Sequence, residues 1–193
     1  MTRTAVRLAG TIALICASAA ITPASSAGTA SAEHCVSRLI STGPVDDQGI
    51  VDAELLDLGC YRTFSKALEV GSEGRTRLAA ATSPHELTQR ILSGSTQQGG
   101  SVLIGTEYTA DSYAGSSHSY FASSTCSSGT TWDVADVGGA WNNDFESGKG
   151  FGGCDTNKKF AWQNFGGDVR TCTPNCATYG ALQNDVTSLR WRA

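Results

Sequence analysis

The chain repeats one short pattern twice, as YTADSYAG at residues 108–115 and as FAWQNFGG at residues 160–167. Each copy has an aromatic residue, four further residues, a second aromatic residue, any residue and a glycine. Two aromatic side chains at this spacing suit a tight hairpin, and the glycine can take the positive φ that other residues resist. The repeat therefore predicts two related hairpins in the C-terminal half of the chain.

Each hairpin is followed by a polar loop, NDFES at residues 143–147 and NDVTS at residues 184–188. Side chains of Asn, Asp and Ser can hydrogen-bond to nearby backbone and brace a turn, which needs no metal. The same loops also offer carboxylate, hydroxyl and carbonyl oxygens, and calcium takes such ligands in sets of six to eight. Structural corners and calcium loops are both consistent with this pattern.

The order hairpin, Asn-Asp loop, hairpin, Asn-Asp loop resembles the βγ-crystallin family over about residues 101–193. In that family Greek-key motifs occur in pairs, and the calcium-binding members carry an Asn/Asp loop that ends in serine. The resemblance implies a mainly β fold, a βγ-crystallin-like double Greek-key sandwich, preceded here by a small helical N-terminal region. It also implies calcium sites that are shared between motifs, with the hairpin of one motif facing the loop of the other.

Carried over residue by residue, the resemblance assigns two calcium sites. The first would consist of the Asp111 side chain, the Val186 carbonyl and the Ser188 hydroxyl. The second would consist of the Gln163 side chain, the Phe145 carbonyl and the Ser147 hydroxyl. Two further carboxylates, those of Asp144 and Asp185, would brace the loops or bind the ion directly.

Three departures from the family pattern predict weak calcium binding. Gly148 and Leu189 stand where the family has a second serine, and the second hairpin offers the amide of Gln163 in place of a carboxylate. The first motif is also longer, because Tyr108 precedes Asp144 by 36 residues whereas Phe160 precedes Asp185 by 25. We therefore expect affinities of extracellular modules, on the order of 10⁻⁴ M or weaker.

The first 32 residues have the organisation of a secretory signal peptide. Arg3 and Arg7 precede an apolar stretch at residues 8–21, and Ala-Ser-Ala at residues 30–32 suits a signal peptidase. The apolar stretch is short for a membrane span, which needs roughly 18 or more apolar residues. The pattern predicts cleavage after Ala32 and secretion to the extracellular space.

Cleavage there would remove Cys16 and leave six cysteines. An even number in an exported chain is typical of disulfides, although six cysteines allow 15 connectivities. Local order favours the pairs Cys35–Cys60, Cys126–Cys154 and Cys172–Cys176. The alternative, a zinc site at Cys172 and Cys176, lacks a second ligand pair at a suitable distance.

The rest of the chain divides by composition into residues 33–92, a Gly/Ser/Gln-rich linker at 93–100 and residues 101–193. Helical spacing predicts helices over residues 61–70 and 83–92, the second with a capping box at Ser83, Pro84 and Glu86. The C-terminal part is expected to form short strands, over residues 101–108, 117–122, 160–164, 168–172 and 188–192.

The charge and the motifs narrow the classes of function. Without the leader, 12 basic and 18 acidic residues give a formal charge of −6, which makes nucleic acid a poor partner. A Gly-x-Ser-x-Gly nucleophile motif is missing, although His118 lies among serines, so we expect a binding protein and no enzyme. We expect no membrane partner either.

A second hypothesis is a secreted protease inhibitor or a killer-toxin-like protein, since such proteins also occur on crystallin-like folds. An inhibitor needs a rigid exposed loop, and residues 172–176 would form one if Cys172 and Cys176 are bridged. An extracellular protein such as a protease is then the expected partner, in addition to calcium.

Overall fold

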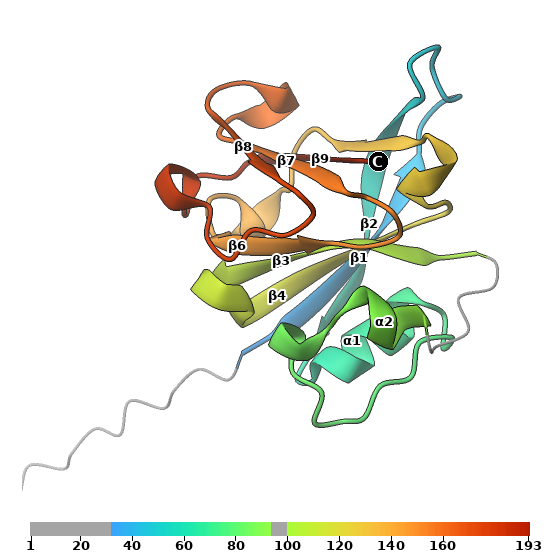
Figure 1. The fold of residues 1–193 in the computed structure, drawn as a ribbon, viewed down its shortest axis with the longest axis vertical. Helices are drawn as coiled ribbons and strands as arrows, with labels where there is room; N and C mark the ends of the chain where they lie inside the picture. The colour runs from blue at the N-terminus through green and yellow to red at the C-terminus, as the bar shows by residue number, and fades with distance from the viewer. Residues whose placement is uncertain (1–31, 94–99) are drawn as a thin grey trace, which may run out of the picture. The chain divides into compact units, whose positions relative to one another are not determined.

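The structure is a computed structural model that describes residues 32–93 and 100–193 (Figure 1). The predicted leader up to residue 31, with Cys16, lies outside these residues, as do positions 94–99 of the predicted linker. Within the described ranges, no helix is long and apolar enough to cross a membrane.

The described residues form nine strands. They are β1 His34–Ser41, β2 Ile50–Tyr61, β3 Val102–Ala110, β4 Ala114–Ala122, β5 Thr131–Val134, β6 Ser147–Gly150, β7 Thr156–Phe160, β8 Val169–Cys172 and β9 Ser188–Arg192. They hydrogen-bond in the order β6-β3-β4-β1-β2-β5-β9-β7-β8. The strands that belong to the two hairpin repeats thus lie at the two ends of the sheet, and β1 and β2 join them.

Helical segments are short. The α-helices are α1 Phe64–Gly71 and α2 Gln89–Ser93, and the 3₁₀ turns are η1 Pro84–Glu86, η2 Asp111–Tyr113, η3 Cys126–Ser128, η4 Gly139–Trp141, η5 Gln163–Phe165 and η6 Gly180–Leu182. Thr63 caps α1 by accepting a hydrogen bond from the Lys66 amide, and the predicted capping box is present at η1.

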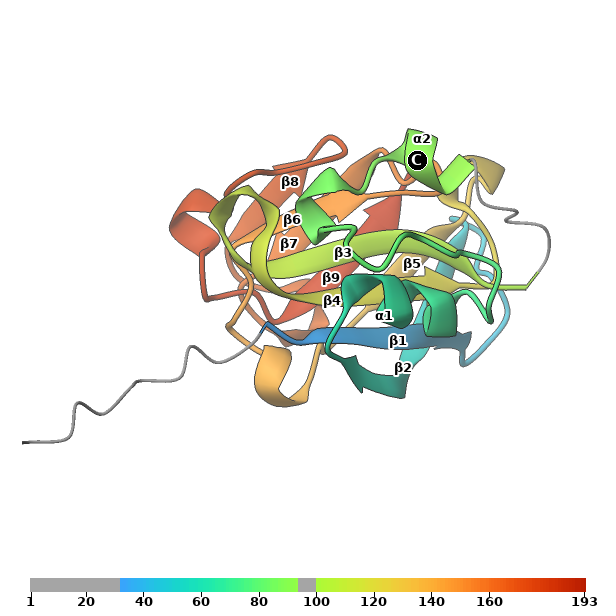
Figure 2. The same ribbon diagram turned by 90° about the horizontal axis from the view of Figure 1, so that it is seen from below.

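Two cores lie on opposite faces of the β3-β4-β1 part of the sheet. Tyr120 of β4 packs with Trp132 and Trp191 in the larger core, between the two halves of the sheet. Its neighbour Phe121 points to the other face and packs with Phe64 of α1. Figures 1 and 2 show the helical segments on this outer face, so that β4 is buried on both sides.

The two C-terminal motifs exchange strands, as in a pair of Greek keys. In the first motif, β3, β4 and β6 stay together, while β5 crosses over to pair with β9 of the second motif. In the second motif, β7, β8 and β9 stay together, while Cys176 makes a bridge to Gly148 of β6. Each motif therefore completes the sheet of the other.

The N-terminal region differs from the predicted helical region. Besides α1 it contributes β1 and β2, which pair with each other through a turn where the Asp46 carboxylate accepts from the amides of Gln48 and Ile50. The helix expected over residues 83–92 is interrupted, because Leu87 has extended backbone between η1 and α2. The strand expected at residues 160–164 ends at Phe160, because Asn164 takes a positive φ of 55°.

Candidate functional site

The two predicted hairpins have the same conformation. The rings of Tyr108 and Tyr113 meet edge to face at 5.7 Å, and those of Phe160 and Phe165 at 5.6 Å. The glycines that end the patterns, Gly115 and Gly167, have φ values of 77° and 73°, which favour glycine. The repeat in the sequence is thus a repeat in backbone geometry.

Each hairpin is held by the serine at the end of its own Asn-Asp loop. The Ser147 hydroxyl donates to the Ala110 carbonyl at 2.6 Å and accepts from the Tyr113 amide at 3.0 Å. In the second motif, the Ser188 hydroxyl donates to the Trp162 carbonyl at 2.7 Å and accepts from the Phe165 amide at 3.1 Å. Both serines are fully buried, so each hydroxyl satisfies two backbone groups that would otherwise lose hydrogen bonds.

The two Asn-Asp loops also bind each other reciprocally. The Asn143 amide donates to the Val186 carbonyl, and the Asn184 amide donates to the Phe145 carbonyl, both at 3.0 Å. Asn143 and Asn184 have positive φ values of 61° and 56°, a conformation that asparagine tolerates better than most residues. A pseudo-twofold axis therefore passes between the loops.

These contacts correct the predicted ligand pairing. Ser147 lies at the hairpin that carries Asp111, and Ser188 lies at the hairpin that carries Gln163, which is the reverse of the predicted assignment. The carbonyls of Val186 and Phe145 already accept hydrogen bonds from the opposite loop. The structure therefore gives the four predicted serine and carbonyl ligands a role in bracing the hairpins and loops.

A different group of oxygen-bearing side chains meets at the first hairpin, and we call it the first loop cluster: Asp111, Glu146, Gln183 and Asn184. The side-chain nitrogen of Gln183 donates to the Asp111 carboxylate at 2.7 Å and to the Glu146 carboxylate at 3.3 Å. The side-chain nitrogen of Asn184 donates to the other Glu146 oxygen at 2.9 Å. Asp111 therefore faces the loop of the other motif, as predicted, but through Gln183.

The second loop cluster, at the second hairpin, consists of Asp136, Asn143, Gln163 and Thr187. The side-chain nitrogen of Gln163 donates to the Asp136 carboxylate at 2.6 Å, and the Thr187 hydroxyl donates to the side-chain oxygen of Asn143 at 3.2 Å. This cluster has one carboxylate where the first has two. The two sites are thus related in position and unequal in charge.

The remaining predicted carboxylates, Asp144 and Asp185, are exposed in the middle of their loops. Partial burial of its carboxyl group and the nearby charge of Glu146 raise the pKa of Asp144. Three or more acidic, histidine or cysteine groups come within metal-binding distance at one place in the described residues, at Glu33, Cys35 and Cys60, where the two cysteines form a disulfide. Any calcium at the loops would therefore take part of its shell from amides, carbonyls and water.

Sequence reasoning missed Glu146, Thr187, Gln183 and Asp136. Glu146 and Thr187 each precede the capping serine by one residue, and adjacent residues of an extended segment point to opposite sides. Once the serines are known to face the hairpins, the preceding side chains must face the opposite loop. That alternation is the signal that would have identified Glu146 and Thr187.

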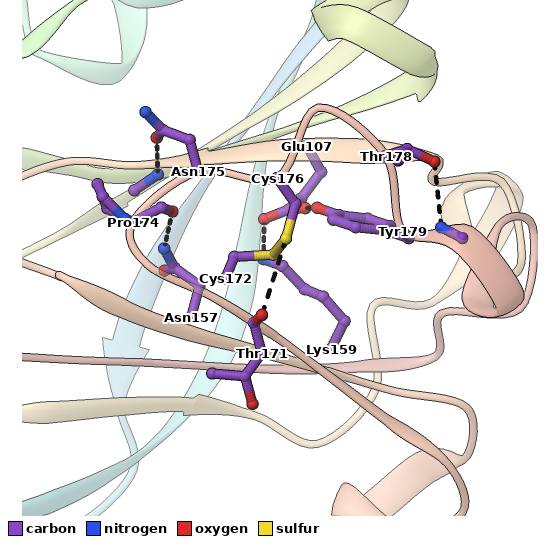
Figure 3. The surroundings of a disulfide bond; sticks show 12 residues. Glu107, Asn157, Lys159, Thr171, Cys172, Pro174, Asn175, Cys176, Thr178 and Tyr179 are labelled. Atoms are coloured by element: carbon purple, nitrogen blue, oxygen red, sulfur yellow. Dashed lines mark hydrogen bonds and ion pairs between the residues drawn. A yellow bond between two sulfur atoms is a disulfide. The ribbon is translucent and has the colours of Figure 1, made fainter.

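A buried ion pair joins the motifs next to the loops (Figure 3). Glu107 and Lys159 each precede the first aromatic residue of their hairpin, and both are at most 1 % exposed. The Lys159 ammonium donates to one Glu107 oxygen and the Tyr179 hydroxyl to the other. Equivalent positions of the two motifs thus carry opposite charges that pair with each other.

The structure contains the three disulfides that local order favoured, Cys35–Cys60, Cys126–Cys154 and Cys172–Cys176. The last closes the loop shown in Figure 3, where the Pro174 carbonyl accepts from the Asn157 side chain at 2.5 Å. The Gly150 amide also donates to the Pro174 carbonyl, and Cys176 bridges to Gly148. The loop is therefore pinned along β6, with Thr173 and Asn175 exposed.

The paired hairpins, the serine caps and the exchanged strands define a two-motif Greek-key module. Solved βγ-crystallin domains match the chain: one from Clostridium beijerinckii at 19% identity, covering 46% of this chain and 97% of that chain with a TM-score of 0.36, and one from Flavobacterium johnsoniae at 17%, covering 47% and 94% with a TM-score of 0.35. A βγ-crystallin from an archaeon matches at 20% identity, covering 47% and 98% with a TM-score of 0.35. No protein-family model and no curated protein matches the sequence.

The chain has a βγ-crystallin-like fold, as its sequence predicted, and it is mainly β with three disulfides. Its own internal geometry carries this assignment, since the hairpin and the serine that holds it each occur twice, and each motif reaches the other's sheet, through β5 in the first and through the Cys176 bridge in the second.

Proposed function

We propose that this chain is a secreted, disulfide-braced structural or interaction module whose paired loops bind calcium weakly. The observation that carries the proposal is the first loop cluster, where the carboxylates of Asp111 and Glu146 meet the carboxamides of Gln183 and Asn184. An extracellular location is compatible with the three disulfides and with the predicted leader. It is also compatible with the described residues having no helix that is long and apolar enough to cross a membrane.

The donor set of the first loop cluster fits calcium chemically. A carboxamide presents its oxygen where it presented its nitrogen once it turns by about 180°, so Gln183 and Asn184 can supply oxygens beside the two carboxylates. Four such groups provide about half of the six to eight ligands that calcium takes, and water and backbone carbonyls would supply the rest. The exposure of Asp111 and Asn184 keeps the expected affinity on the order of 10⁻⁴ M.

The second loop cluster is the weaker candidate. It offers the Asp136 carboxylate, the amides of Asn143 and Gln163 and the Thr187 hydroxyl, with a single formal charge. Because calcium affinity depends on the number of charged ligands, we expect this site to fill after the first.

Thermal unfolding with excess EDTA and with 10 mM calcium tests the proposal. For a dissociation constant near 10⁻⁴ M, calcium should add about 2.7 kcal/mol to the free energy of unfolding. The double substitution Asp111→Asn with Glu146→Gln should remove most of this gain. Asp168→Asn, at an exposed carboxylate outside both clusters, is the matched control. An unchanged midpoint in calcium, or an equal gain in the double variant, would show that the clusters are hydrogen-bonded corners.

Protease inhibition remains the second candidate, and the rigidity of the 172–176 loop favours it. The loop is closed by a disulfide and pinned at the Pro174 carbonyl, while Thr173 and Asn175 are exposed. The Pro174 carbonyl and the Cys176 amide are occupied by β6 and Asn157, and the Asn175 side-chain oxygen accepts from the Gly150 amide at 3.2 Å. A protease would therefore have to engage Thr173 and the side-chain nitrogen of Asn175. The intact chain should then inhibit one class of extracellular protease, and Thr173→Asp should abolish inhibition. A panel that includes serine and metalloproteases and shows no inhibition would remove this candidate.

A further inference from the structure

A cavity of about 400 Å³ lies beside the second loop cluster, where β1, β2 and β4 meet residues 137–141. Its walls include Ser37 of β1, Asp57 of β2, His118 of β4 and Trp141. Ser37 and Asp57 are direct cross-strand neighbours, and β1 pairs in parallel with β4. The N-terminal strands therefore build this cavity together with the first motif.

His118 is 4 % exposed, and its two ring nitrogens have different surroundings. Its Nε2 lies 2.8 Å from the Ser37 hydroxyl. Its Nδ1 is buried and has no hydrogen-bond partner among the described residues. Because Nδ1 is itself buried, His118 meets the cavity with its ring and not with this nitrogen.

The serine–histidine pair is poorly suited to nucleophilic catalysis. Burial lowers the pKa of His118 to about 3, although the nearby Asp57 charge opposes the shift. A general base works best when its pKa is near the working pH, and a triad also needs an acid that orients the second ring nitrogen. Here the second nitrogen is unpartnered and Ser37 is 2 % exposed, so neither the base nor the nucleophile is arranged for acyl transfer.

The charged group of the cavity is a hydrogen-bond acceptor. The Asp57 carboxylate can only accept, and the Gly59 amide uses one of its oxygens. Two of the backbone amides at the cavity, those of Val137 and Gly138, are already bound to the Thr187 carbonyl and the Asp136 carboxylate. A ligand that brings N–H donors to the Asp57 carboxylate fits this arrangement.

The charges and rings point in the same direction. Asp57 is the charged side chain that lines this cavity, and the smaller hollow next to it, of about 160 Å³, is lined by Glu33 and Asp144. Trp141 lines both and lies 4.9 Å from the His118 ring. Among the described residues, neither hollow is lined by a lysine or an arginine. Aromatic rings and carboxylates together attract cations and repel anions.

We propose that the cavity between β1, β2, β4 and Trp141 binds an organic cation that carries N–H donors, a guanidinium or a primary ammonium group. The Asp57 carboxylate pairs with the charge and accepts its N–H donors, and Trp141 and the His118 ring provide aromatic walls. None of the described residues that line the cavity belongs to a loop cluster, although Asp136 and Thr187 of the second cluster hold the Gly138 and Val137 amides at its wall.

The test is an NMR titration of the full chain, in EDTA, with N-acetyl-arginine amide, with the citrulline counterpart that has the same shape and no charge, and with agmatine. We expect the arginine compound or agmatine to shift the amides of residues 138–141 and the indole N–H resonance of Trp141. The citrulline compound should bind at least about tenfold more weakly, because it lacks the charge-assisted hydrogen bonds.

Asp57→Asn is the discriminating variant, because it removes the charge and keeps the oxygen that accepts from the Gly59 amide. It should weaken binding about tenfold, whereas Asp47→Asn, at an exposed carboxylate in the β1–β2 turn, should not. Equal binding of the arginine and citrulline compounds overturns the proposal, as does binding that Asp57→Asn leaves unchanged. A response to a neutral monosaccharide alone, or to none of the probes at 20 mM, overturns it as well.

Discussion

The second strands of the two motifs, β4 and β8, start from the same hairpin geometry and have opposite environments. β4 is nine residues long, pairs with β3 and β1, and is buried over most of its length. β8 is four residues long, lies at the edge of the sheet, and exposes Val169, Arg170 and Thr171. Counted from the hairpin glycine, the buried His118 of β4 corresponds to the exposed Arg170 of β8.

The difference shows what the N-terminal region contributes. β1 covers the outer edge of β4, while a short strand that bears a charge leaves the edge of β8 unattractive to other chains. One motif is protected by added structure and the other by its own sequence. The following experiments test how far the equivalence of the motifs extends.

The largest effect is expected where the motifs carry opposite charges, at Glu107 and Lys159. Lys159→Met should lower the free energy of unfolding by about 3–5 kcal/mol, because it leaves the Glu107 carboxylate buried without its partner. Adding Glu107→Gln should restore most of the loss, since glutamine is neutral and still accepts from the Tyr179 hydroxyl. Chemical denaturation measures both. A double variant as unstable as the single one would contradict a role limited to charge compensation.

The covering of β4 by β1 can be loosened through the Cys35–Cys60 disulfide. Cys35→Ala with Cys60→Ala should cost roughly 2–4 kcal/mol and should speed hydrogen exchange of the β4 amides toward the rates of β8. The control is Cys126→Ala with Cys154→Ala, which opens a loop of similar length, 28 residues against 25. If both variants expose β4 equally, β1 does not protect it specifically.

The capping serines should be equivalent. Ser147→Ala and Ser188→Ala each remove a buried hydroxyl that serves two backbone groups, so each should cost about 1–3 kcal/mol. The two losses should agree within about 0.5 kcal/mol in denaturant titrations. A large loss in one motif alone would show that the hairpins differ in strength despite their matching geometry.

The smallest change from one measured point to the next is expected in the pH dependence of stability that His118 gives to the first motif. Because burial holds the pKa of His118 at about 3, the unfolded chain binds more protons than the folded chain between pH 6.5 and about 3. Stability should therefore fall with falling pH in this window, by up to about 1.4 kcal/mol per unit. His118→Gln should flatten the slope relative to the exposed-site control His85→Gln. Burial also lowers the pKa of His34, so part of the slope should persist.

The predictable parts of the fold are those encoded by local backbone demands. The aromatic spacing, Gly115 and Gly167, and the asparagines with positive φ specify hairpins and corners within a few residues of each other. β1 was not predicted because its burial depends on β4, which lies 83 residues further along the chain at the His34–Ser117 contact. A strand stabilised by so distant a partner carries little local signal.

The candidate site divides in the same way. The sequence located both Asn-Asp loops and the approach of Asp111 to the opposite loop. It assigned the serines to the wrong hairpin. Side chains of an extended segment alternate between two faces, so a shift of one residue in the assignment exchanges the faces. Glu146 and Thr187, the positions that face the loop clusters, differ between the motifs, while Ser147 and Ser188 are identical. The residues that repeat are therefore those that fix the backbone conformation, and the residues that differ are those that determine what each loop cluster could bind.

The parallel pairing of β1 with β4 has a consequence for how the chain reaches its folded state. β1 and β4 are separated by 83 residues at the His34–Ser117 contact, and they must meet before the sheet can close. The chain therefore loses conformational entropy before the contacts between these strands stabilise it. The β1–β2 hairpin is made first and exposes an unpaired edge until the first motif arrives. Folding of this protein is expected to be slow for its size. Aggregation during refolding should fall when the protein concentration is low, because fewer unpaired β1–β2 edges then meet.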